Sequence, residues 1–131
     1  MVQKNKNKIL IVEDDEDFVW IVIQGLLKEN FSVVSASNGQ EGLEMIKKEK
    51  PDLVLLDILM PIMDGLTMLE ELRHGGEYEK NLPVILLTNL SANSEDIIKK
   101  VAETGPAHYI VKVNFPVKQI VEKVKELLMQ K

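Results

Sequence analysis

The amino-acid sequence predicts a single α/β domain, a doubly wound (βα)5 sandwich in which a five-stranded parallel sheet carries helices on both faces. Five short apolar segments have the length of strands, and an amphipathic segment of helical period follows each one after a short connection. Strands buried on both faces of a parallel sheet are unbroken apolar runs, and the helices between them form right-handed crossovers. With 131 residues, 45% of them hydrophobic, the chain can bury the core of one domain of this kind, and no second domain fits.

The first strand is predicted at residues 9–12, an apolar run that stops at five consecutive acidic residues, 13–17. A helix follows over residues 16–30, because apolar residues recur there at helical spacing and Asp14 or Asp15 can cap its first turn. The first strand is therefore expected to end in a cluster of carboxylates.

Two residues of this first helix are unusual for their positions. Gly25 lies in the helix interior, where glycine costs about 1 kcal/mol relative to alanine, so we expect a close contact there. Trp20 lies outside the apolar stripe, so we expect its ring to be partly exposed.

The second and third strands follow the same pattern. Residues 31–36 predict a strand, and the helix after it covers residues 40–48. The third strand, residues 53–56, is an unbroken apolar run that ends at Asp57. Asp64-Gly65 then predicts a turn before the next helix.

The second half of the chain contains a polar loop and two further strands with their helices. The helix after the Asp64-Gly65 turn covers residues 66–73, and residues 74–80 predict the longest polar loop of the chain. The fourth strand is residues 83–87 and the fifth is residues 109–111. Their helices are predicted from residues 91–94 to about 104, and over residues 116–130.

Composition excludes several classes of function. The chain has no cysteine, which rules out disulfides, thiol nucleophiles and cysteine metal ligands and suits the cytoplasm. Its formal net charge of −5 and its aromatic content of 5% argue against a nucleic-acid-binding surface. The apolar run at residues 9–12 is too short for a signal peptide or a membrane span. We therefore expect a cytoplasmic protein that contacts neither membrane nor nucleic acid.

Four of the five predicted strands end in polar residues of chemical use, and parallel strands bring these ends to one edge of the sheet. The residues are Glu13 and Asp14, then Asp57, Thr88 and Lys112. If the first strand lies beside the third, their carboxylates meet and repel each other unless a hard cation such as Mg²⁺ lies between them. Carboxylates, a hydroxyl and an ammonium group suit phosphoryl transfer with Asp57 as the nucleophile.

These residues resemble a known family, the response-regulator receiver domains of two-component signalling, or CheY-like superfamily. The resemblance extends from Lys8 to Leu128 and rests on four segments in order: Ile-Leu-Ile-Val-Glu-Asp-Asp at residues 9–15, Asp57-x-x-Met60-Pro61-x-x-Asp64-Gly65, Leu87-Thr88, and Tyr109-Ile-Val-Lys112. It implies the flavodoxin-like strand order 2-1-3-4-5. It also implies a receiver domain over residues 8–129, preceded by a disordered or frayed N-terminus at residues 1–7.

The resemblance implies a magnesium site and a phosphorylation site. Asp57 is expected to accept the phosphoryl group and to contact the metal. Asp14 is expected to bind Mg²⁺ directly and Glu13 through water, while the backbone carbonyl of Leu59 completes the metal shell. Because Leu59 and Leu90 are apolar and cannot orient an attacking water, we expect slow self-dephosphorylation.

The resemblance also implies a switch. Thr88 and Lys112 are expected to contact phosphoryl oxygens, and Tyr109 is expected to turn inward when they do. The surface made by the helix near residues 91–104, the fifth strand and the last helix then changes shape, and partners bind it.

The implied partners are a histidine kinase or phosphotransferase protein as donor and an unknown downstream protein. The chain is expected to catalyse its own phosphotransfer without turning over a small molecule. Whether phosphorylation drives dimerisation, and whether the chain is a stand-alone protein or an excised domain, stays open.

Three alternatives compete with this interpretation. An aspartyl-nucleophile phosphatase of the haloacid dehalogenase type would need an acid two residues after the nucleophile, where Leu59 stands. A pseudo-receiver that binds partners without phosphorylation is disfavoured by the intact Asp14, Asp57, Thr88 and Lys112. Flavodoxin-like FMN binding would need a phosphate-binding loop, and no strand end here resembles one.

The sequence departs from the family where Val113 follows Lys112, since proline is usual at that position, commonly after a cis bond. A cis bond before valine would cost about 2.5–4 kcal/mol, so a trans bond is predicted.

Overall fold

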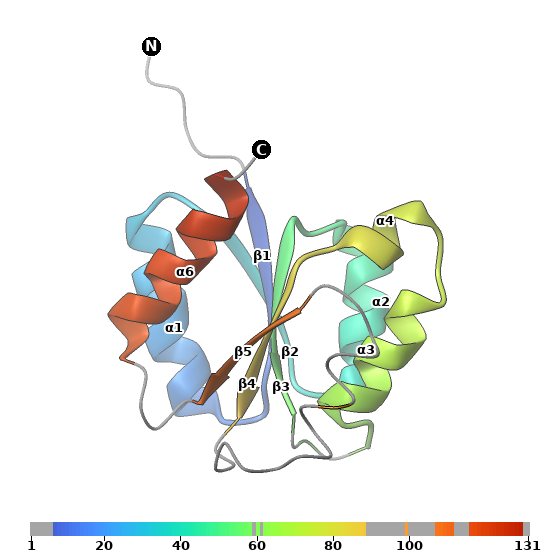
Figure 1. The fold of residues 1–131 in the computed structure, drawn as a ribbon. Helices are drawn as coiled ribbons and strands as arrows, with labels where there is room; N and C mark the ends of the chain where they lie inside the picture. The colour runs from blue at the N-terminus through green and yellow to red at the C-terminus, as the bar shows by residue number, and fades with distance from the viewer. Residues whose placement is uncertain are drawn as a thin grey trace.

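The computed structural model describes residues 7–58, 60, 62–88, 99, 107–111 and 116–129, with the backbone alone at residues 88 and 107–111. Five parallel strands form one sheet in the order β2-β1-β3-β4-β5, which confirms the predicted fold class and strand order (Figure 1). The strands are β1 Lys8–Val12, β2 Ser32–Ala36, β3 Leu53–Asp57, β4 Val84–Thr88 and β5 Ala107–Val111.

Helices cover both faces of the sheet. The described helices are α1 Glu16–Lys28, α2 Gly39–Glu49, α3 Gly65–Arg73, α4 Glu77–Asn81 and α6 Val117–Met129. In Figure 1, α1 and α6 lie on one side of the sheet, and α2, α3 and α4 lie on the other. The predicted bounds of α1, α2, α3 and α6 agree with these to within two residues at each end.

Two hydrophobic cores hold the layers together, one on each face of the sheet. Because successive strand residues point to opposite faces, Ile9 and Ile11 of β1 pack with α1 and α6, whereas Leu10 and Val12 pack with α2 and α3. All five residues of β3 are buried. Burial on both faces explains why β1 and β3 appear in the sequence as unbroken apolar runs.

The prediction of a continuous polar loop at residues 74–80 was wrong, because α4 begins at Glu77 within it. None of the residues of α4 is buried, so the segment has no apolar stripe to indicate a helix. Contacts from outside hold it in place. The Arg73 guanidinium donates from Nη1 to the carbonyl oxygens of Glu79 (2.8 Å) and Leu82 (3.0 Å).

Three sequence predictions about the fold fall on residues outside the described part of the structure. They are the disordered or frayed N-terminus, of which only residue 7 is described, the helix near residues 91–104, and the trans bond between Lys112 and Val113. No described helix is both long and apolar enough to cross a membrane.

Tyr78 of α4 is expected to make the stability of the fold sensitive to alkaline pH. Its hydroxyl donates to the carbonyl oxygen of Pro51, and the Lys50 ammonium lies 5.0 Å from the centre of its ring. Burial, aided by the carboxylates of Asp52 and Glu79, raises the pKa of the hydroxyl to about 12.

The stabilising contribution of the Tyr78 hydroxyl is expected to be fully present below about pH 10 and to be lost as the pH rises from about 10 to about 12. In that window the unfolded chain releases the phenolic proton while the folded chain retains it, so unfolding becomes more favourable. Because the side chain is only partly buried, we expect a loss of about 1 kcal/mol. Urea unfolding of the wild type and of Tyr78→Phe between about pH 9 and about pH 12 measures this loss of stability. A stability gap between the two proteins that does not narrow with rising pH would contradict the assignment.

Candidate functional site

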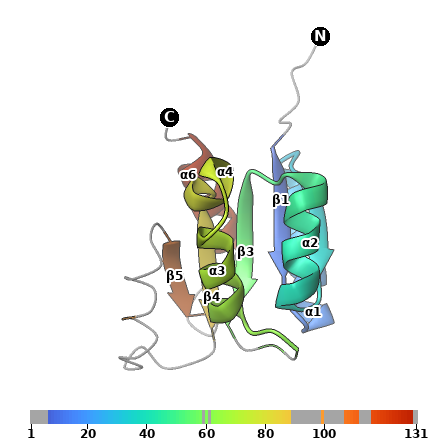
Figure 2. The same ribbon diagram turned by 90° about the vertical axis from the view of Figure 1, so that its right-hand side faces the viewer.

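The site lies where β1 and β3 end side by side at the same edge of the sheet. The two strands are paired in parallel, with Val12 opposite Leu56, so Glu13 and Asp57 follow this pair at matching positions. Both strands run toward the lower edge in Figure 2. Glu13 is 3% exposed and Asp57 is 6% exposed, and within the described part of the chain they are the buried polar or charged residues. Asp14 beside them is exposed.

The three acidic side chains converge. One carboxylate oxygen from each of Glu13, Asp14 and Asp57 lies within 4.8 Å of the other two. In an octahedral magnesium shell with bonds of about 2.0–2.1 Å, neighbouring oxygens are about 2.9 Å apart and opposite ones about 4.2 Å. Oxygen donors at this spacing, with net negative charge, fit a hard divalent cation. The carboxylate cluster that the strand ends predicted is therefore present and could hold a metal ion.

The start of α1 fixes the geometry of two members of the cluster. Asp15 is the N-cap of α1, and its side chain accepts a hydrogen bond from the backbone N–H of Phe18 (3.2 Å). The backbone N–H of Asp15 donates to Oε2 of Glu13 (3.1 Å), which orients that buried carboxylate. Of the two capping candidates, the structure selects Asp15. The carboxylate of Asp14 does not cap the helix and is therefore available to the cluster.

The turn after β3 packs against the backbone of Asp57. The N–H of Gly65 donates to the carbonyl oxygen of Ile58 (2.8 Å), and Asp64 caps α3 through a hydrogen bond from the N–H of Thr67 (2.8 Å). A Cβ atom at Gly65 would lie 2.1 Å from the carbonyl oxygen of Asp57. Sequence reasoning identified Asp64-Gly65 as a turn but missed this contact. The one indication of this contact in the sequence is a glycine directly after a capping aspartate.

The same loop is also tied to α2. The N–H of Gly39 donates to the carbonyl oxygen of Met63 (3.0 Å), and a Cβ atom at Gly39 would lie 2.7 Å from that oxygen. Gly39 was not predicted to support the site. These backbone contacts hold the loop that follows Asp57 from two sides.

The remaining predicted site residues are only partly described. Thr88 ends β4, the strand next to β3, and its backbone pairs with Val111 of β5. Tyr109 lies in β5 opposite Leu86. The side chains of Thr88 and Tyr109, together with Leu59 and Lys112, lie outside the described part of the structure. Their predicted roles stay predictions.

Comparisons with known proteins agree with this geometry. The chain is 37% identical to the probable transcriptional regulator ycf27 of Porphyridium aerugineum, over 94% of this chain and 48% of that protein. It is 33% identical to the alkaline phosphatase synthesis transcriptional regulatory protein PhoP of Bacillus subtilis, over 92% of this chain and 48% of that protein. The chain thus spans about half the length of these curated relatives.

Solved structures and a family model also match most of this chain. The BeF3-activated N-terminal receiver domain of Klebsiella pneumoniae RstA superposes with a TM-score of 0.81 at 35% identity, covering 95% of this chain and all of that one. A CheY-like receiver domain protein from Methanospirillum hungatei gives a TM-score of 0.82 at 29% identity, over 95% and 94% of the two chains. The family model for the response regulator receiver domain matches residues 9–125. This chain therefore belongs to the response regulator receiver domain family.

Proposed function

We propose that this chain is a phosphorylation-dependent switch in which Asp57 accepts a phosphoryl group from a histidine kinase or a phosphotransferase protein in a Mg²⁺-dependent reaction. The observation that carries the proposal is the position of Asp57. Its carboxylate is buried at the end of a central strand and lies within 4.8 Å of two further carboxylates. A carboxylate that is buried at a strand end, beside two further carboxylates that can share a cation, has the surroundings that a metal-assisted nucleophile needs.

The transfer itself uses one carboxylate oxygen of Asp57. That oxygen attacks the phosphorus of the donor phosphohistidine, the P–N bond breaks, its electron pair returns to the imidazole, and an aspartyl phosphate forms. Asp14 and Glu13 would hold Mg²⁺, Asp14 directly and Glu13 through water. When bound, Mg²⁺ would partly neutralise the negative charge of the phosphoryl oxygens. The hydrogen bond from the N–H of Asp15 keeps Glu13 oriented toward the cluster.

Thr88 and Lys112 would then contact two phosphoryl oxygens, and Tyr109 would respond as the switch residue. The family membership and the position of Thr88 at the end of β4, beside β3, support this assignment. The two states would differ on the surface formed by the segment near residues 91–104, β5 and α6. In this proposal the chain turns over no small molecule, and its output is the binding of a downstream protein.

The length of the relatives limits what the proposal can say about nucleic-acid contact. The matched relatives are named as transcriptional regulators and are about twice as long. The expectation of no nucleic-acid contact therefore applies to these 131 residues alone, and cytoplasmic location stays a prediction.

The test is phosphorylation by acetyl phosphate in the presence of Mg²⁺, followed by measurement of the intact mass. We expect the wild type to gain the mass of one phosphoryl group, and Asp57→Asn to gain none. Asp52→Asn is the matched control, because Asp52 lies at the opposite end of β3, where its carboxylate accepts a hydrogen bond from the N–H of Lys8 (2.8 Å). This control should be phosphorylated like the wild type, and a chelator should abolish the gain in both. A phosphoryl group that remains on Asp57→Asn would refute the assignment of the acceptor.

A further inference from the structure

The solvent face of α1 carries an unusual amount of exposed apolar surface. Trp20 is 64% exposed, and Ile21 and Leu27 are each 48% exposed. Within the described part of the chain they are three of the five large hydrophobic side chains that are exposed, the others being Ile62 and Met129. Exposed apolar surface concentrated on one helix is typical of a surface that binds another molecule.

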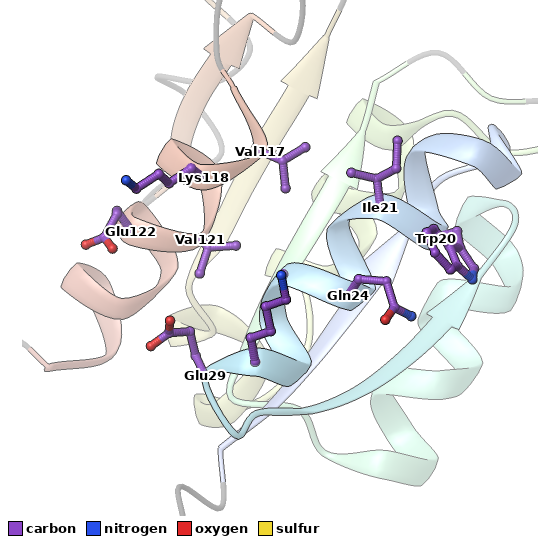
Figure 3. Close-up of a pocket in the computed structure, with 10 residues that line it drawn as sticks. Trp20, Ile21, Gln24, Glu29, Val117, Lys118, Val121 and Glu122 are labelled. Carbon is purple, nitrogen blue, oxygen red and sulfur yellow. The ribbon is translucent and has the colours of Figure 1, made fainter.

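A groove runs along one side of this helix, between α1 and α6. Its volume is about 540 Å³, and its walls come from Trp20, Ile21 and Gln24 of α1 and from Val117 and Val121 of α6 (Figure 3). Gly25 forms the floor, since a Cβ atom there would lie 3.0 Å from Cγ2 of Val121. The predicted close contact at Gly25 and the predicted exposure of Trp20 are thus both confirmed, and together they shape this face.

The charges on α1 are arranged so that the helix complements itself. Asp17 in the first turn and Lys28 in the last are eleven residues apart, three helical turns, so they lie on the same face. Trp20 and Leu27, seven residues apart, lie together beside that row. If a second α1 lies antiparallel across a two-fold axis near residue 23, Asp17 faces Lys28 of the second copy. The same axis places Trp20 against Leu27 of the second copy, and every contact occurs twice.

We propose that a second copy of this chain covers the α1 face, with the two α1 helices antiparallel. The exposed Ile21 of the second copy then lies near Gly25, at the mouth of the groove between α1 and α6. Trp20 is the central anchor, as tryptophan commonly is in protein interfaces. This dimer needs neither Mg²⁺ nor phosphorylation, so it goes beyond the proposed function and does not depend on it. One helix face per subunit makes a small interface, for which we expect a dissociation constant of about 10–100 μM.

The first experiment uses Trp20 as its own reporter, because it is the one tryptophan of the chain. Sedimentation velocity of the unphosphorylated protein without Mg²⁺ should show a monomer becoming a dimer across about 1–500 μM, spanning the expected constant. Over the same range the tryptophan emission should shift to the blue as the ring leaves water. Trp20→Ala should weaken the dimer at least about 30-fold. Ile62→Ala removes an even more exposed apolar side chain elsewhere and should leave the dimer unchanged.

The second experiment tests the antiparallel pairing. Asp17→Lys alone places two lysines opposite each other, and Lys28→Asp alone places two aspartates opposite each other, so each variant should dimerise about tenfold more weakly. An equimolar mixture of the two variants should form a heterodimer of wild-type affinity, because both charge pairs are then restored. A protein that stays monomeric with unshifted emission would overturn the proposal and leave the face to a different protein. A dimer that survives Trp20→Ala, or a mixture that fails to associate, would overturn it as well.

Discussion

Replacing Gly65 with alanine is expected to lower the free energy of unfolding by about 3 kcal/mol and to reduce phosphorylation of Asp57 severely. The added methyl group would lie 2.1 Å from the carbonyl oxygen of Asp57 and 3.0 Å from Cα of Ile58. Both are backbone atoms, so no side-chain rotation relieves the clash. Either the end of β3 or the start of α3 must move, and each movement displaces the nucleophile from Glu13 and Asp14.

Urea unfolding and the phosphorylation assay together test this expectation. Gly76→Ala is the matched control, because Gly76 also lies at the start of a helix but a Cβ atom there meets only Oε1 of Glu79, at 3.4 Å. The control should lose no more than about 1 kcal/mol and should be phosphorylated normally. A Gly65→Ala protein as stable as Gly76→Ala would show that the loop after Asp57 is free to shift, and that Gly65 does not position the site.

Replacing Asp14 with asparagine is expected to weaken Mg²⁺ binding by at least about 100-fold, with little change in stability. The substitution removes one of three converging negative charges and replaces a carboxylate oxygen with a neutral amide oxygen. Losing a residue that merely supports a metal ligand costs about 10–100-fold, so losing a direct ligand should cost at least as much. Because Asp14 is exposed and does not cap α1, the fold should not depend on it.

Isothermal titration calorimetry with Mg²⁺ measures the effect, and Asp15→Asn is the control. That variant changes the net charge equally at the next residue, and asparagine caps a helix as well as aspartate does. Its Mg²⁺ affinity should fall only slightly, through the lost long-range charge. Equal losses of Mg²⁺ affinity in the two variants would mean that Asp14 acts only through its negative charge and is not a ligand.

The sequence by itself determined the central sheet and the edge at which the site lies. Residues 9–12 and 53–56 could be assigned as buried strands because burial on both faces leaves a continuous apolar run in the chain. Glu13 and Asp57 could be placed at the same edge because parallel strands share it, and they meet there because β1 lies beside β3. These inferences use patterns within a few residues, and local patterns are readable without coordinates.

Tertiary structure decided the features that depend on how the elements meet in space. It selected Asp15 over Asp14 as the cap of α1, placed Gly65 against the backbone of Asp57, and positioned α4 through Arg73. It also set Gly25 against Val121 across the groove between α1 and α6, a contact between residues almost a hundred positions apart. None of these has a periodic signature. Each results from two surfaces meeting, and the distance between surfaces is fixed only when the whole core packs.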